Sequence, residues 1–143
     1  FEVIYDGGEF EGTITLTSGK DNSQKLSNKV NIRMAPGSAL AKATIYMNVE
    51  KISNVLAVKG FVWEVYGYKA GELVYEDKGD FYGINTTTNN KINIVEDYRL
   101  SEENTEFTIY LWLDGNQVSN EIIGAEFQAY IGAKTENFTG SLK

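Results

Sequence analysis

Apolar and polar residues alternate with a period of two along most of this chain, and this pattern predicts β-strands rather than helices. Between Ala43 and Val49, every second residue is apolar and the residues between them are polar, which indicates one buried face. The same pattern predicts strands at residues 12–18, 30–34, 43–50, 55–68 with a break near Gly60, 73–75, 81–84, 92–95, 105–113 and 126–133. Short strands at this spacing predict an all-β antiparallel sandwich or barrel of about nine strands, in a single domain that spans residues 1–143.

Turn-forming residues separate the expected strands. Pro, Gly, Asp and Asn concentrate at residues 35–38, 77–80, 85–90 and 114–116. The last of these, Asp114-Gly115-Asn116, is a strong hairpin signal. Helical periodicity is almost absent, and Ser101 followed by two glutamates predicts at most one helical turn over residues 101–105.

The first residues stand apart from this pattern. Phe1, Val3 and Tyr5 share one face of a short extended strand, and Gly7 and Gly8 follow as a flexible hinge. We therefore expect residues 1–8 to form an N-terminal extension, whose apolar strand either folds back onto its own sheet or inserts into a neighbouring molecule. The chain starts with Phe and not with Met, which favours an exported, secreted protein whose signal peptide has been removed.

Charge and residue content exclude several classes of function. The net charge is −7, from 20 acidic and 13 basic residues, so the chain lacks the basic face that nucleic-acid binding requires. No apolar run approaches the roughly 20 residues that cross a bilayer, so membrane insertion is not expected. The absence of Cys and His excludes disulfides, Ser-His-Asp triads and His-based zinc sites, and we expect no enzyme activity. A pair of carboxylates is the remaining enzymatic alternative, drawn from Glu64, Glu72, Glu76, Asp97 and Glu126.

Aromatic side chains occupy strand positions that are polar in an ordinary half-buried sheet. Tyr110 and Trp112 lie on the face of the strand at 105–113 opposite to its apolar face, and Trp63 and Tyr66 are a second such group. Three interpretations are open: loops cover these rings, a second subunit contacts them, or they stack on sugar rings. The third makes a secreted carbohydrate-binding module the alternative function.

Calcium is the one cofactor for which the chain offers candidates. Oxygen ligands cluster at two expected turns, where Asp77, Asp80 and Asp114 are weak candidate ligands. Neither turn matches the twelve-residue calcium loop of EF-hand proteins. No other cofactor is expected.

Two stretches resemble the TasA and camelysin family of secreted bacterial biofilm-matrix proteins. FEGTITL at residues 10–16, the Ala-Pro-Gly-Ser turn at 35–38 and the strand at 43–49 resemble the opening strands of that family, and residues 107–133 resemble its closing pair. The resemblance implies a jelly-roll domain that is exported and assembles into an extracellular fibre. Camelysin-like members are described as metalloproteases, but this chain has no histidine to hold zinc, so we do not expect that activity.

In such fibres the N-terminal segment of one subunit completes the sheet of the next, and Phe1, Val3 and Tyr5 would be the donor strand here. A donated strand pairs with an open sheet edge, and because donor and acceptor are different surfaces, the contact grows head-to-tail. We therefore expect the structural subunit of an extracellular, pilus-like filament, with copies of itself as partners and other matrix components or glycans as further candidates. A structure that places residues 1–5 in the chain's own sheet, with no other molecule filling a gap there, would refute this hypothesis.

Overall fold

The computed structural model describes residues 3–6, 9–13, 26–37, 41–88, 90–114 and 125–137. These residues form an all-β structure of two antiparallel sheets, and the only helical element within them is a 3₁₀ turn at Asn54–Leu56. No helix in these ranges is long and apolar enough to cross a membrane. The strands are β1 (Val3–Asp6), β2 (Glu9–Thr13), β3 (Leu26–Met34), β4 (Ala41–Ile52), β5 (Phe61–Lys69), β6 (Glu72–Asp80), β7 (Asn90–Arg99), β8 (Thr105–Leu113) and β9 (Glu126–Asn137).

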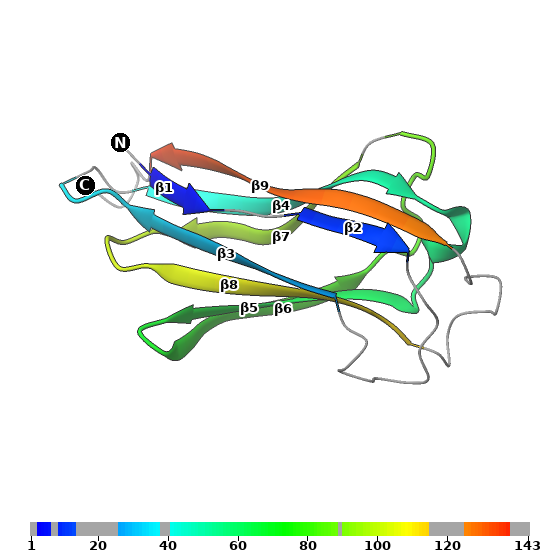
Figure 1. Cartoon of the computed structure of the whole chain (residues 1–143). Helices are drawn as coiled ribbons and strands as arrows, with labels where there is room; N and C mark the ends of the chain where they lie inside the picture. Colours follow the sequence, from blue (N-terminus) through cyan, green and yellow to red (C-terminus); the bar gives the residue numbers. More distant parts are fainter. Residues whose placement is uncertain are drawn as a thin grey trace.

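The strands alternate between the two sheets. One sheet has the order β1-β3-β8-β5-β6 and the other has the order β2-β9-β4-β7. Consecutive strands lie in opposite sheets at every step except from β5 to β6, which form a hairpin. The two sheets lie one above the other as layers (Figure 1).

Side chains from both layers enclose one apolar core. Every second residue is buried there over residues 30–34 of β3, 43–49 of β4 and 107–113 of β8, which confirms the alternation predicted for these stretches. Phe61 on β5 packs edge-to-face on Phe127 of β9, with 5.2 Å between ring centroids, and so joins the two layers. Phe81 stacks on Phe61 at 4.2 Å between centroids.

The outer face of β4 is less exposed than the sequence suggests. Thr44 and Asn48 alternate with the core residues of β4, yet only 8% and 6% of their surfaces are exposed. At Thr44, the neighbouring strand β7 bulges, and the side-chain oxygen of Thr44 accepts a hydrogen bond from the N–H of Asp97 at 3.3 Å. Asn48 stands in register between β7 and β9, because β4 is a central strand of its sheet. Neighbouring strands therefore cover side chains that alternation alone would expose.

The hairpin of β5 and β6 differs from the sequence prediction. Residues 77–80, which were expected to turn, belong to β6, and residues 81–84, which were expected to form a strand, follow it as turn and coil. The chain reverses earlier, at Ala70 and Gly71, whose φ angles of 52° and 81° are those of a type I′ hairpin turn. Gly79 serves close packing, because a Cβ at this position would lie 2.6 Å from the ring of Trp63.

Four other sequence predictions differ in how they compare with the structure. The helical turn expected at residues 101–105 is wrong: Ser101 instead accepts a hydrogen bond from the N–H of Glu103 at 3.3 Å, and β8 begins at Thr105. The strand expected at 92–95 is part of the longer β7. Of the strand expected at 12–18, residues 14–18 lie outside the described residues, as do Gly115 and Asn116 of the expected hairpin.

Candidate functional site

The expected donor strand lies at the edge of the five-stranded sheet. Within the described ranges, β1 pairs with β3 alone, and the register sets Val3 opposite Met34 and Tyr5 opposite Ile32. Both β3 residues are buried in the core, so Val3 and Tyr5 stand in register with core-facing positions. Residues 3–5 thus occupy an edge of their own sheet. This placement contradicts a donor strand that is unpaired in its own subunit. Donation to a neighbour therefore requires that β1 first separates from β3.

The strand after β1 belongs to the other sheet. β2 pairs with β9 and sets Glu9 opposite Tyr130. Only Gly7 and Gly8 separate β1 from β2 in sequence, and glycine has the widest range of backbone angles of any residue. Phe1, Gly7 and Gly8 themselves lie outside the described residues. The sequence assigned them as donor and hinge, and that assignment stays a prediction.

The four candidate aromatic residues do not form an exposed platform. Trp63 faces the core with 6% of its surface exposed, because it alternates in phase with buried residues of β5, so its assignment as an exposed contact is wrong. Trp112 lies on the outer face of β8, but only 7% of it is exposed, which also contradicts that assignment. Tyr66 and Tyr110 are partly exposed on adjacent strands, and their rings meet edge-to-face at 6.0 Å between centroids.

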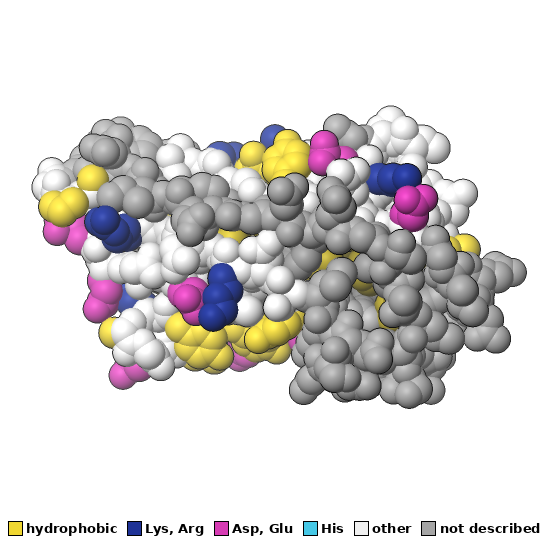
Figure 2. Space-filling view, viewed as in Figure 1, with side chains coloured by type: hydrophobic (Ala, Val, Ile, Leu, Met, Phe, Trp, Pro, Cys, Tyr) yellow, Lys and Arg dark blue, Asp and Glu magenta, His cyan; other side chains and the backbone are white. Residues whose placement is uncertain are grey.

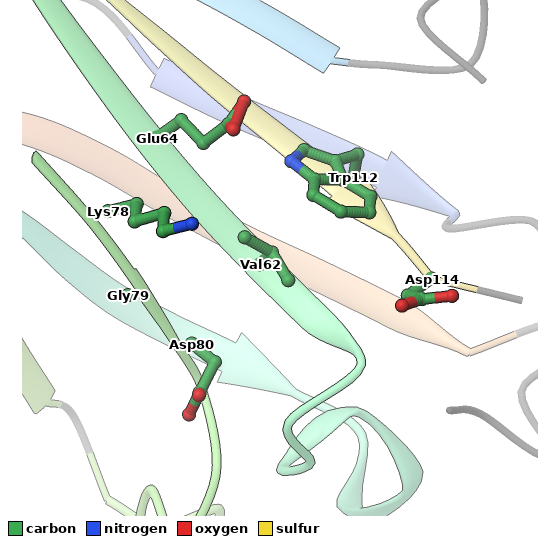
Figure 3. Close-up of a pocket in the computed structure, with 7 residues that line it drawn as sticks. All are labelled: Val62, Glu64, Lys78, Gly79, Asp80, Trp112 and Asp114. Carbon is green, nitrogen blue, oxygen red and sulfur yellow. The ribbon is translucent and has the colours of Figure 1, made fainter. Parts of the chain in front are cut away.

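A hollow of about 380 Å³ opens on the outer face of this sheet near Trp112, and we call it the Trp112 hollow (Figure 3). Strand register explains its composition, because Asp80, Val62 and Trp112 form one row across β6, β5 and β8. Lys78 and Glu64 are opposite each other in the next row. The residues that line the hollow are Val62, Glu64, Lys78, Gly79, Asp80, Trp112 and Asp114.

Sequence reasoning found only part of this set. Asp80 and Asp114 were candidate calcium ligands, Glu64 a candidate hydrolytic carboxylate and Trp112 a candidate aromatic contact, whereas Val62 and Lys78 were not considered as site residues. The sequence could show that these residues point to the outer face of their strands, because side chains alternate between the two faces. Which of them are neighbours depends on the register between β5 and β6, which the sequence does not show.

Electrostatics at the hollow are dominated by carboxylates. Burial raises the pKa of the nearby Tyr66 phenol, and the negative charges of Glu64 and Glu76, together with a hydrogen bond to Glu64, raise it further. The face of the molecule in Figure 2 has interspersed acidic and basic side chains, and its apolar groups form small separate patches.

Of the candidate calcium ligands, Asp80 and Asp114 both line the Trp112 hollow, whereas Asp77 lies outside it. Asp77 and Asp80 both lie on β6, but residues three apart in a strand point to opposite faces. Each has a local role: Asp77 accepts a hydrogen bond from the N–H of Lys78 at 2.8 Å, and Asp80 accepts one from the N–H of Tyr82 at 3.0 Å. In the part of the chain that the structure describes, no group of three or more metal-ligating residues comes together.

The acidic residues considered for hydrolysis are spread over both sheets. Glu64, Glu72 and Glu76 lie on β5 and β6. On the opposite sheet, the Asp97 carboxylate lies 3.6 Å from the Lys42 ammonium group, and the Glu126 carboxylate lies 3.1 Å from that of Lys51. The latter two carboxylates are thus paired with lysines.

Comparison with protein-family models, curated proteins and solved structures finds no match for this chain. The resemblance to the TasA and camelysin family therefore rests on the motifs quoted above.

Proposed function

We propose that this protein is the structural subunit of an extracellular filament and that it assembles head-to-tail by exchanging β1 between neighbouring subunits. One observation carries the proposal: β1 is an edge strand with β3 as its partner in the described part of the chain, and two glycines separate it from a strand of the other sheet. A terminal strand with one partner and a hinge beside it is suited to exchange between copies.

The strand order supports a jelly-roll sandwich as the scaffold. Without β1, the sheet β2-β9-β4-β7 faces the sheet β3-β8-β5-β6. Eight strands divided between two facing sheets are what a jelly roll requires, so this arrangement is consistent with one. β1 is then an addition to this eight-stranded scaffold, and among the described residues its departure breaks only its pairing with β3. A donor strand requires this independence from the rest of the fold.

The acceptor in this proposal is the edge of β3 that β1 covers in the single chain. When β1 leaves, the backbone groups of β3 between Asn31 and Met34 lose their partners, and an open edge of this kind favours pairing with another strand. The β1 of a neighbour restores the same register, with Val3 opposite Met34 and Tyr5 opposite Ile32. Each backbone hydrogen bond contributes about 0.5–1.5 kcal/mol, so a strand of this length is weakly enough held to exchange.

Concentration decides between the two arrangements. The same backbone contacts form whether β1 pairs within one chain or with a neighbour, so they contribute almost equally to both states. The remaining difference is the translational freedom lost on association, which high protein concentration offsets. We propose that the filament forms outside the cell, where glycans or other matrix components are further candidate partners. The TasA-like motifs at residues 10–16, 35–38, 43–49 and 107–133 support this location.

A cysteine pair distinguishes the two arrangements directly. The chain has no natural cysteine, and Ile4 lies opposite Arg33 in the β1–β3 register. The double variant Ile4→Cys/Arg33→Cys therefore forms a disulfide within one chain when β1 pairs internally, and between chains when β1 is exchanged. After assembly and oxidation, we expect a ladder of covalent oligomers on a non-reducing gel.

The same variant supplies its own reversal test. Oxidation at high dilution should give a covalently closed monomer that forms no filaments by electron microscopy until a reductant is added. The single variant Ile4→Cys is the control, and it should assemble like the wild type without a ladder. A chain lacking residues 1–8 should keep its β-sheet circular dichroism spectrum but stay monomeric. Three results would each refute strand exchange. The closed monomer could form filaments, oxidised filaments could contain subunits that run as monomers on the gel, or the wild-type chain could stay monomeric at high concentration.

A further inference from the structure

The Trp112 hollow lies away from the β1 edge. It spans β8, β5 and β6, whereas β1 is at the opposite edge of the same sheet, beyond β3. The exchange of β1 makes no use of it, so its function is a separate question. Figure 3 shows its side chains arranged around Val62, from three adjacent strands.

The lining of the hollow restricts its ligand chemistry. The lining includes three carboxylates, those of Glu64, Asp80 and Asp114, and one ammonium group, that of Lys78. This excess of negative charge disfavours carboxylate, sulfate and phosphate ligands. Val62 and the 7% of the Trp112 surface that remains accessible add a small apolar area. A suitable ligand therefore has many hydroxyl donors, some apolar C–H surface and no negative charge.

We propose that the Trp112 hollow binds a saccharide of one or two sugar rings that carries no acidic group. Sugar hydroxyls donate hydrogen bonds to the carboxylates and accept one from Lys78, while the C–H face of a ring packs on Val62 and Trp112. The volume of about 380 Å³ lies at the lower end of the range of ligand pockets, roughly 300–1,000 Å³, which fits a short saccharide. Of the four aromatic residues considered for sugar stacking from the sequence, only Trp112 belongs to this hollow.

Several lining side chains are already held in place. The Oδ1 atom of Asp80 accepts a hydrogen bond from the N–H of Tyr82, and Glu64 is hydrogen-bonded to Tyr66. Lys78 stands opposite Glu64 across the β5–β6 pair. Groups that are fixed before binding lose little freedom on binding, so they contribute more of their hydrogen-bond energy to affinity.

The test measures binding of three disaccharides to the full chain by isothermal titration calorimetry. The probes are cellobiose, which is neutral, the glucosamine disaccharide, which bears ammonium groups, and digalacturonic acid, which bears carboxylates. We expect the first two to bind in the millimolar range and the acidic disaccharide to bind at least about tenfold more weakly, because like charges repel. Failure of both neutral and amine-bearing probes to bind at about 50 mM would overturn the proposal, and so would equal binding of all three.

Substitutions then locate the site. Glu64→Gln and Asp80→Asn keep the shape of each side chain, and Asn at position 80 retains the oxygen that accepts from Tyr82. We expect each to weaken cellobiose binding about tenfold, since a charged hydrogen-bond acceptor becomes a neutral one. Glu76→Gln is the matched control, because it removes the same charge from β6 outside the hollow. Unchanged affinity in both hollow variants, or an equal loss in the control, would assign the binding elsewhere and overturn the proposal.

Discussion

The substitution Gly79→Ala tests the packing of β6 against the core. A Cβ at residue 79 would lie 2.6 Å from Cζ2, 2.7 Å from Cε2 and 2.8 Å from Nε1 of Trp63. All three distances are shorter than real Cβ contacts, and the crowded group is a rigid, buried ring rather than the end of a flexible chain. Either the indole or β6 must therefore move.

Two opposing effects set the size of the change. Overpacking of a core by one methyl group costs typically about 1–3 kcal/mol. Replacing glycine by alanine also removes freedom from the unfolded chain, which returns about 0.4–1 kcal/mol where the backbone angles suit alanine. Gly79 is not among the glycines with positive φ, so this second effect applies. We expect a net loss of about 1–2 kcal/mol in the free energy of unfolding.

Urea denaturation followed by circular dichroism measures this loss, and a shift in the near-ultraviolet spectrum should accompany it because the environment of Trp63 changes. Lys78→Ala is the control, since it removes a side chain from the outer face of the same strand and should change stability by less than about 0.5 kcal/mol. Smaller side chains at position 63 should relieve the clash, so Gly79→Ala should cost less in a Trp63→Phe background. A neutral or stabilising Gly79→Ala, with no coupling to position 63, would refute this account of the glycine.

Two further predictions concern the hairpin and the pH dependence of stability. Ala70→Asn should raise the free energy of unfolding, measured by urea denaturation, by about 0.5–1 kcal/mol. The reason is that φ at this position is 52°, in the left-handed region that Asn tolerates better than Ala. A loss of stability would contradict the assigned turn. Burial raises the pKa of the Tyr75 phenol, and the negative charges of Asp77 and Glu96 raise it further. The backbone N–H of Glu96 acts in the opposite direction, because it donates a hydrogen bond to the Tyr75 oxygen at 3.4 Å. The unfolded chain therefore ionises first near pH 10, so the Tyr75 contribution to stability is present below about pH 10 and is lost as the pH rises through the folded pKa. Tyr75→Phe should thus lose less stability than the wild type between about pH 9 and pH 11, and equal losses would show that Tyr75 is not responsible.

The corrected positions show why local sequence signals were insufficient in β6. Asp77-Lys78-Gly79-Asp80 has the composition of a turn, yet all four residues pair with β5. Glycine is common both in turns and where another group approaches the backbone closely, and only the position of the Trp63 ring distinguishes the two cases. Trp63 itself was recoverable from the sequence, because it alternates in phase with Phe61 and Val65, which are both buried.

The sequence alone determined the all-β class and the inward faces of β3, β4 and β8, because the period of two in a strand is a local property of the backbone. It also marked residues 1–8 as distinct. Only the tertiary structure decided three other features. These are the edge that accepts β1, the burial of Thr44 and Asn48, and the row formed by Asp80, Val62 and Trp112. Each of these depends on which strands are neighbours and in what register, and residues far apart in the chain set both.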